Sequence, residues 1–260
     1  MAQIRYGART AAQLEDREVK ATSVGAWSTS LTASYETDPE LIAAVLPPPL
    51  EPTDQPLVRV SVATVDLGEG RPPFGAGTFA VQARHGDVVG NYPLVMPMTT
   101  EQSVIGGRET FGEPKKIGQV DLVRTGDELV GTFTRLGVTF VEIRGRAVET
   151  LPTPPDAHRV DFYFKFLRAP DGHGLDSDPA LVYCHRDDST RELERVEGEI
   201  ILRDSPYDPV ADLPVRRIVS LTVGQKRSVQ RGEIVGRVPA ADVLPYVHQR
   251  YDDLAPTGTK

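Results

Sequence analysis

Short runs of alternating apolar and polar residues, separated by glycine- and proline-rich turns, constrain the fold of this chain more than any other feature. Within residues 57–63, Val58, Val60 and Val62 alternate with polar or small residues, which is the period of a half-buried strand. Residues 159–167 repeat the pattern, with one packed face and one polar face. Little helical pattern separates successive runs, so parallel βαβ units are not expected. The sequence therefore predicts a mainly β (α+β) fold, an antiparallel β-barrel or curved double sheet with a few short helices.

A single domain spanning residues 1–260 accommodates these elements, because no internal repeat or linker divides the chain. Met1 to Ser30 is weakly patterned and is expected to form an N-terminal arm or edge segment. Short helices are predicted after residue 38, over residues 101–109, and from about Ala241 or Pro245 to Leu254. Beyond the strand that begins at residue 57, strands are predicted at 78–84, 87–95, 119–124, 128–136, 138–149, 159–167, 180–184, 194–202, 217–229 and 233–238.

The charge balance excludes several classes of partner. The formal net charge is -8 at pH 7, whereas nucleic acids and anionic membranes bind basic surfaces. No apolar run approaches the length of a membrane span, and residues 1–20 lack the apolar core of a signal peptide. Cys184 is the only cysteine, so an intrachain disulfide is impossible, which fits a reducing compartment. These properties favour a cytoplasmic enzyme without nucleic-acid or membrane partners.

Two adjacent lysines mark the segment whose chemistry is most distinctive. Lysine is rare in this chain compared with arginine, yet Lys115 and Lys116 follow Pro114 directly, between Gly112 and Gly118. A buried lysine can lose its proton and attack a carbonyl to form a Schiff base, whereas arginine stays protonated. The segment is also compatible with a charged turn on the surface.

A resemblance to a known family favours the first interpretation. Arg108-Glu109, Pro114-Lys115-Lys116 and Gly118 resemble the active-site segment of acetoacetate decarboxylase and its superfamily. The resemblance extends from about residue 35 to residue 251 and includes, at similar spacings, Gly90, Tyr92 and residues 56–59, 129–132, 212–215 and 218–220.

This resemblance implies a cone-like β-barrel meander with a buried pocket and assembly into a homo-oligomer. It implies that Lys115 is the Schiff-base lysine and Lys116 its catalytic neighbour, in a carbon–carbon lyase that needs no cofactor. Arg108, Phe111 and Glu113 lie close to the pair in sequence and are the candidates for binding a small oxo-acid substrate. Either carboxylate of this segment could also act as a general acid or base.

The sequence departs from the family at the polar groups that surround the imine. The decarboxylases carry two pocket glutamates and an arginine. A gapless alignment from Val58 to Lys116 puts Ser61 and Ala76 at the glutamate positions, and the arginine position falls near Ser28. Three functions therefore stay open: decarboxylation of a β-keto acid, which we favour; aldolase-dehydratase or cyclase chemistry on a 2-oxo acid such as pyruvate; and non-catalytic binding of a small molecule.

Strand geometry predicts how the two lysines are oriented. Adjacent side chains of an extended segment point to opposite faces, so Lys115 and Lys116 are expected to face opposite sides. Burial, more than the charge of Lys116, is expected to favour the neutral amine of Lys115. Because a nearby carboxylate would favour the ammonium, Glu113 is expected to point away. The five histidines show no metal-ligand spacing and no nucleotide-binding glycine motif occurs, so neither a metal nor a cofactor is expected.

Overall fold

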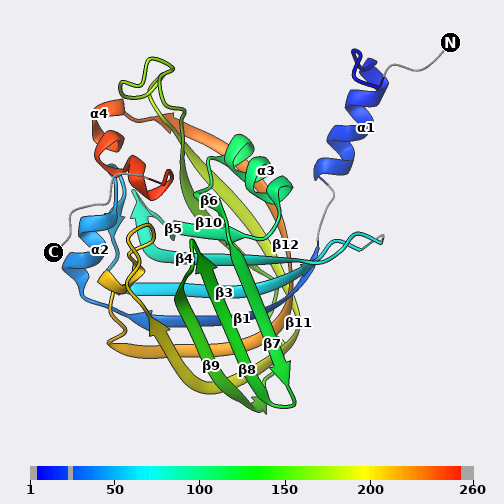
Figure 1. Ribbon diagram of the computed structural model, residues 1–260, viewed down its shortest axis with the longest axis vertical. Coiled ribbons are helices and arrows are strands. Elements are labelled where there is room, and N and C mark those ends of the chain that lie inside the picture. The colour runs from blue at the N-terminus through cyan, green and yellow to red at the C-terminus, as the bar shows by residue number, and fades with distance from the viewer. Residues whose placement is uncertain (1–4, 23–25, 69, 253–260) are drawn as a thin grey trace.

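A closed barrel of seven strands forms the body of the protein, as the sequence predicted (Figure 1). The computed structural model describes residues 5–22, 26–68 and 70–252. The barrel strands are β1 (Trp27–Glu36), β3 (Leu57–Asp66), β4 (Phe74–His85), β5 (Val88–Met98), β10 (Ala157–Lys165), β11 (Ala180–Leu202) and β12 (Arg217–Arg237). The remaining strands are β2 (Glu51–Pro52), β6 (Lys115–Ile117), β7 (Gln119–Thr125), β8 (Glu128–Arg135) and β9 (Val138–Thr150). The helices are α1 (Ala11–Thr22), α2 (Pro39–Val45), α3 (Glu101–Phe111), η1 (Val210–Asp212), α4 (Ala240–Val243) and η2 (Leu244–Gln249).

The barrel closes because β10 pairs with strands on both of its sides. The order around the ring is β10-β5-β4-β3-β1-β12-β11, and antiparallel pairing of β11 with β10 completes it. β10 meets β5 in parallel orientation through Asp161 and Asn91. β6 also runs parallel to β5, with Lys115 opposite Met96. The antiparallel prediction therefore holds for most pairings, and the two parallel ones lie beside the lysine segment.

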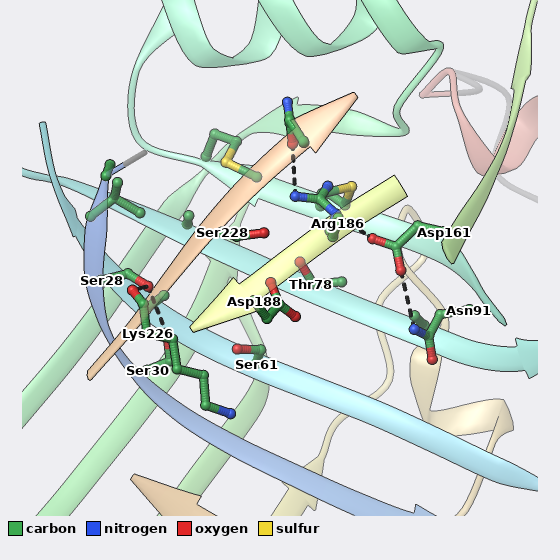
Figure 2. A pocket seen from close by; sticks show the side chains of 18 of the residues that line it. Ser28, Ser30, Ser61, Thr78, Asn91, Asp161, Arg186, Asp188, Lys226 and Ser228 are labelled. Carbon is green, nitrogen blue, oxygen red and sulfur yellow. Dashed lines mark hydrogen bonds and ion pairs between the residues drawn. The ribbon is translucent and has the colours of Figure 1, made fainter. Parts of the chain in front are cut away.

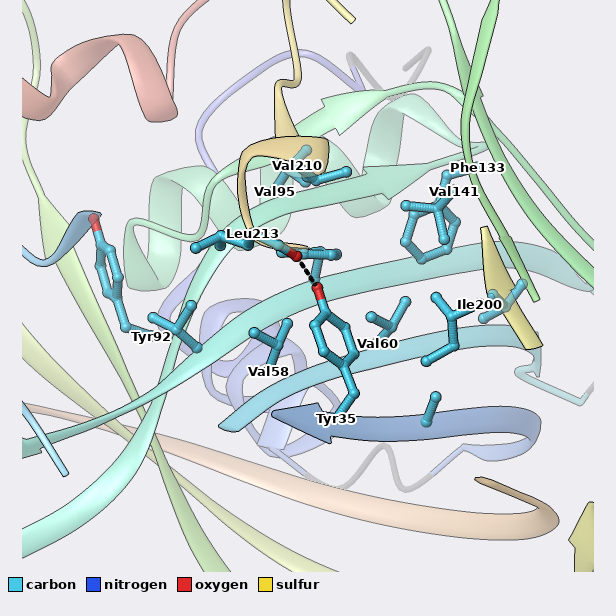
Figure 3. Packing of buried hydrophobic residues seen from close by; sticks show 14 of the residues in the cluster. Tyr35, Val58, Val60, Tyr92, Val95, Phe133, Val141, Ile200, Val210 and Leu213 are labelled. Atoms are coloured by element: carbon cyan, nitrogen blue, oxygen red, sulfur yellow. Dashed lines mark hydrogen bonds between the residues drawn. The ribbon is translucent and has the colours of Figure 1, made fainter. Parts of the chain in front are cut away.

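The outer face of the barrel packs against a second layer formed by β7, β8 and β9, which joins the barrel along β11 (Figure 1). Tyr35, Val58 and Val60 point from the barrel toward these strands and are fully buried. Phe133 of β8 packs in the same cluster (Figure 3). The Tyr35 hydroxyl donates a 2.8 Å hydrogen bond to the carbonyl oxygen of Leu213, so its polar atom is satisfied inside the core. The side chains packed between the barrel and these strands are part of the main hydrophobic core.

The alternate residues of the barrel strands point inward. Along β3, Arg59, Ser61 and Ala63 face the interior, while the valines between them face the core. The polar face predicted for residues 159–167 is also internal, since Asp161 is 4% and Tyr163 1% exposed. Alternation thus identified the two faces of these two strands, but the polar face lies inside the barrel and not in solvent.

Several predicted boundaries need correction. β1 begins at Trp27 and pairs with both β3 and β12, so residues 27–30 belong to the barrel and not to an arm or edge. The strands predicted at 180–184 and 194–202 are parts of β11, and those at 217–229 and 233–238 are parts of β12. The C-terminal helix is two short elements, α4 and η2, and residue 254 lies outside the described residues, as do residues 1–4 and 23–25 of the predicted arm. The assignment of residues 1–260 to one domain stays a prediction. Within the described ranges, no helix combines the length and apolarity needed to cross a membrane.

Candidate active site

A glycine-capped helix leads the lysine segment to the barrel. α3 ends at Phe111, and the left-handed conformation of the capping residue Gly112 (φ 81°) lets the chain turn sharply. The N–H of Glu113 donates to the carbonyl oxygen of Gly107, a hydrogen bond typical of a helix that ends at a glycine. The chain then enters β6, where Lys115 lies beside Met96 of β5.

Lys115 and Glu113 form a buried ion pair. The Lys115 Nζ lies 2.7 Å from the Glu113 Oε2, and the two side chains are 13% and 0% exposed. Residues two apart in an extended segment share one side of the chain, which explains the contact. The prediction that Glu113 points away from the amine is therefore wrong. Arg186 contacts the other carboxylate oxygen, Oε1, at 3.1 Å, so Glu113 bridges an amine and a guanidinium.

Gly107 of α3 leaves room for this ion pair. A Cβ atom at this position would lie 1.9 Å from the Glu113 Oε2 and 2.7 Å from the Lys115 Nζ. Both distances are far below van der Waals contact. Gly106, its neighbour, has open space where a Cβ would be. Of the two glycines, only Gly107 is required by the geometry of the site.

The Lys115 side chain borders a pocket inside the barrel. All seven barrel strands contribute side chains to the lining, and the cavity measures about 390 Å³. Met96 and Met98 form part of an apolar wall on the side of Lys115. Ser61 and Ala76 also line the pocket, so the positions at which the resemblance implies glutamates carry a hydroxyl and a methyl group.

A network of charged side chains from β10 and β11 extends along the pocket (Figure 2). The Arg186 Nε donates to the Asp161 Oδ2 at 2.5 Å, and Asp161 also accepts hydrogen bonds from Arg159 and Asn91. Burial alone would raise the pKa of Asp161, but the charges of Arg159 and Arg186 outweigh it and lower that pKa to about 2. Asp161 is thus a fixed negative charge that holds Arg186 against Glu113.

Lys116 points to the opposite side of β6. Its Nζ lies 3.1 Å from the Asp208 Oδ1 and 3.2 Å from the Asp252 Oδ1, and its side chain is 5% exposed. Arg135 contacts the second oxygen of both aspartates at 2.6 Å. Burial would raise the pKa of Asp252, but the Arg135 hydrogen bond and the charge of Lys116 outweigh it and lower that pKa. The structure therefore separates the two lysines, and Lys116 belongs to a buried ion cluster outside the Lys115 pocket.

Arg108 and Phe111 lie beside the pocket lining. The Arg108 Nη1 donates to the carbonyl oxygens of Lys115 and Arg250 at 3.1 and 3.0 Å, which ties α3 to β6 and to the C-terminal segment. Phe111 packs in an apolar cluster against Gly232, where its ring atoms would lie 2.7 Å from an added Cβ. Both residues hold the site in shape, and contact of either with a substrate stays a prediction.

The sequence did not predict that Asp161, Arg159 or Arg186 belongs to the site. The available signal was charge at alternate positions inside predicted strands, next to aromatic or aliphatic neighbours. Such a face is directed to solvent in an open sheet and to the interior in a closed barrel. Alternation alone does not distinguish these two cases.

Comparison with known proteins identifies the family. The family model described as acetoacetate decarboxylase (ADC) matches residues 9–238. Acetoacetate decarboxylase from Paraburkholderia phytofirmans is 26% identical over 193 residues, which cover 73% of this chain and 76% of that protein. Acetoacetate decarboxylase from Bordetella avium is 28% identical over 195 residues, which cover 72% and 76%.

Solved structures share the fold. An acetoacetate decarboxylase structure matches with a TM-score of 0.73 and 24% identity, covering 84% of this chain and 93% of that one. The enduracididine biosynthesis enzyme MppR complexed with pyruvate matches with a TM-score of 0.68 and 17% identity, covering 81% and 90%. An acetoacetate decarboxylase-like enzyme from Sphingomonas wittichii RW1 matches with a TM-score of 0.65 and 18% identity, covering 82% and 91%. Because the family model spans most of the sequence, this chain belongs to the acetoacetate decarboxylase family.

Proposed function

We propose that this chain is a Schiff-base lyase that decarboxylates a β-keto acid through an imine on Lys115. The observation that carries this proposal is the amine of Lys115, in contact with the buried carboxylate of Glu113 and bordering a pocket inside the barrel with an apolar wall. The relatives named acetoacetate decarboxylase support the same reaction class. A cytoplasmic location and assembly into a homo-oligomer stay predictions from the sequence.

Proton transfer within the ion pair generates the nucleophile. The amine must be neutral to attack, and the Glu113 Oε2, 2.7 Å from the Lys115 Nζ, is the group placed to take its proton. The neutral amine bonds to the keto carbon, and a proton moves from nitrogen to the new alkoxide. Glu113 then protonates the departing hydroxyl group, which leaves as water. The result is a protonated imine on Lys115 and an ionised Glu113, which the Arg186 contact stabilises.

The protonated imine accepts the electron pair of the C–C bond that breaks as CO2 leaves. The enamine that results takes a proton at its α-carbon, and water hydrolyses the imine to release the ketone and regenerate the amine. Overall, one keto-acid anion and one proton become one ketone and one CO2. Met96 and Met98 favour the breaking step, because a carboxylate against an apolar wall loses hydration whereas CO2 carries no charge.

Aldolase-dehydratase chemistry on a 2-oxo acid is the second candidate. Two observations favour it: Ser61 and Ala76 stand where the decarboxylases carry glutamates, and a fold neighbour is described as complexed with pyruvate. In this case the same imine would accept the electron pair of an α-C–H bond, and the carboxylate would be retained. The two candidates share Lys115 and differ in the bond that breaks.

Borohydride trapping tests the proposal. Acetoacetate, 3-oxohexanoate and pyruvate should each be offered with sodium borohydride, which reduces an imine to a stable secondary amine. Mass mapping is expected to find the adduct on Lys115, accompanied by CO2 release from the β-keto acids. Lys226 also lines the pocket and Lys116 is the neighbour in sequence, so both act as internal controls.

Every other outcome of the trapping experiment supports a different function or contradicts the assignment of Lys115. An adduct from pyruvate without CO2 release from any β-keto acid supports the aldolase-dehydratase candidate. Trapping without turnover of any oxo acid supports a non-catalytic binding barrel. An adduct on Lys226, or none on any lysine, would refute the assignment of Lys115.

Gly107→Ala should lower kcat/KM for CO2 release by about 10- to 100-fold, because the added methyl group must displace the Lys115 and Glu113 side-chain ends. Both ends are flexible, so the fold should survive. Gly106→Ala is the matched control: it adds the same methyl group into open space on the same helix and should leave kcat/KM unchanged. Equal rates for the two variants would show that the close approach at Gly107 has no bearing on catalysis. Rates and thermal unfolding measured together distinguish a displaced site from a damaged fold.

A further inference from the structure

Among the described residues, the charges that line the pocket do not balance. Its cationic side chains are Arg59, Lys115, Arg159, Arg186 and Lys226. The carboxylates that line it or contact those cations, among the described residues, are Asp161, Asp188 and Glu113. Five cations and three carboxylates leave a formal excess of two positive charges around a cavity of about 390 Å³.

Two of the cations have no carboxylate partner in the part of the chain that the structure describes. Lys115, Arg159 and Arg186 together contact all three carboxylates at 2.5–3.1 Å. The charged groups of Arg59 and Lys226 have neither a hydrogen bond nor an ion pair with any residue that the structure describes. Both side chains are partly buried, and a partly buried cation without a hydrogen-bonded anion loses hydration that a bound anion would offset.

These two cations and several hydroxyl groups share one region of the pocket. Arg59 points inward from β3, and Lys226 lies in β12 opposite Ser28 of β1. Figure 2 shows Lys226 on the side lined by Ser28, away from Asp161. The Ser228 Oγ, from β12, is buried and lacks a hydrogen-bond partner within the described residues. Unsatisfied donors of this kind match an anionic oxygen ligand.

Burial and neighbouring cations act on both groups, and the charge of Asp188 opposes them by raising both pKa values. Burial first, and the charge of Arg159 second, lower the pKa of Arg59 to about 10. Burial first, and the charge of Arg59 second, lower the pKa of Lys226. A single bound anion would therefore relieve the repulsion and the desolvation of both groups.

We propose that Arg59 and Lys226 bind a substrate carboxylate that the reaction does not remove, which makes the substrate an oxo dicarboxylic acid. This inference rests on the proposed function, because the imine on Lys115 fixes the keto carbon at the apolar wall. A guanidinium matches a planar carboxylate through two parallel hydrogen bonds, and an ammonium adds a second charge. The excess of two positive charges equals the charge of a dicarboxylate.

Cationic surroundings stabilise a carboxylate and so oppose its loss as CO2. The carboxylate that leaves therefore lies at the wall of Met96 and Met98, and the retained one lies at Arg59 and Lys226. A 3-oxo dicarboxylic acid provides both groups in one molecule. A six-carbon acid of this class is small relative to a cavity of about 390 Å³, which is within the usual range for ligand pockets.

Two substrates that differ in one terminal group test this proposal. 3-Oxoadipate carries a distal carboxylate where 3-oxohexanoate carries a methyl group, and both lose CO2 from the same β-keto position. The unmodified protein should process 3-oxoadipate with kcat/KM about 10- to 100-fold higher, the range of a charge-assisted hydrogen bond. Arg59→Met and Lys226→Met should each move the ratio of the two kcat/KM values toward one, chiefly by raising KM for 3-oxoadipate. Arg84→Met is the control, since Arg84 pairs with Glu51 outside the pocket lining and should not alter the ratio.

Calorimetric binding of the two ketone products, 4-oxopentanoate from 3-oxoadipate and 2-pentanone from 3-oxohexanoate, separates the subsite from the reaction. 4-Oxopentanoate should bind at least about tenfold more tightly, and this preference should disappear in the Arg59 and Lys226 variants. That result supports the carboxylate subsite even if Lys115 forms no imine, in which case only the Schiff-base proposal fails. Equal binding of the two ketones, with the imine on Lys115 intact, would refute the dicarboxylate proposal and leave the Schiff-base proposal standing. Lys226→Gln, which keeps a polar side chain, replaces Lys226→Met if the latter does not fold.

Discussion

Lys115→Met should reduce kcat/KM for CO2 release from a β-keto acid by about 10⁴-fold or more and eliminate the borohydride adduct. Methionine keeps the length and apolar stem of lysine, so the pocket retains its shape while the amine is lost. Without the amine no imine forms, and the electron pair of the breaking C–C bond has no acceptor. The rate of CO2 release and the mass of the protein after reduction measure both effects.

Lys115→Arg separates the amine from its charge. Arginine keeps a positive charge beside Glu113, but it stays protonated and cannot condense with a ketone. Lys165→Met is the matched control, because Lys165 is a partly buried lysine at the end of β10 outside the pocket lining. Inactivity of both Lys115 variants beside an active Lys165→Met is the expected pattern. CO2 release by Lys115→Arg above about one tenth of the unmodified rate would mean that charge, and not the imine, drives the reaction.

The position and orientation of Lys115 could be predicted because they depend on neighbouring residues. The run around Pro114, Lys115 and Lys116 carries the family resemblance, which the family model confirms. The opposite orientation of the two lysines follows from the alternation of side chains along any extended segment. Neither inference requires knowledge of distant parts of the chain.

Two local arguments gave opposite predictions for the direction of the Glu113 side chain, and the wrong one was preferred. Residues two apart in an extended segment lie on the same side, so the rule that separates the two lysines brings Glu113 and Lys115 together. The expectation that Glu113 points away gave more weight to the cost of an ion pair next to a nucleophile. Arg186 offsets this cost by contacting the second carboxylate oxygen of Glu113.

The partners of the charged network could not be predicted, because they depend on strand register and barrel closure. Arg186 contacts Glu113 across 73 residues of sequence, and Lys116 contacts Asp208 across 92. A shift of one residue in the register of β11 would turn its side chains to the other face. Nothing local to Asp161 or Arg186 determines that register.

Lys116→Met should lower the free energy of unfolding by about 3 kcal/mol, because it removes one cation from a buried cluster. Lys116 and Arg135 together contact both carboxylate oxygens of Asp208 and of Asp252, and the Asp208 side chain is fully buried. In the variant a single guanidinium faces two carboxylates in a site that excludes most water. Urea unfolding measures the loss. Lys165→Met is the control, because Lys165 has no ion-pair partner within the described residues, and it should change the free energy of unfolding by less than about 0.5 kcal/mol.

A double-mutant cycle tests whether the loss arises from the ion cluster. Asp208→Asn removes a charge of the opposite sign, so the double variant should lose about 1–3 kcal/mol less than the sum of the two single losses. Simple additivity would indicate that Lys116 stabilises the fold through packing of its stem and not through Asp208. The cycle therefore separates charge from volume at this position.

The two lysine variants should then fail in different ways. Lys115→Met keeps the buried contact between Arg186 and Glu113, so it should stay folded and lose the reaction. Lys116→Met should lose stability. At a temperature where this variant is folded, it should release CO2 much faster than Lys115→Met, because the ammonium of Lys116 faces away from the pocket. Rates compared at equal folded fraction make the distinction. Comparable losses of rate in two folded variants would mean that Lys116 acts on the amine of Lys115 despite the opposite orientation of their side chains.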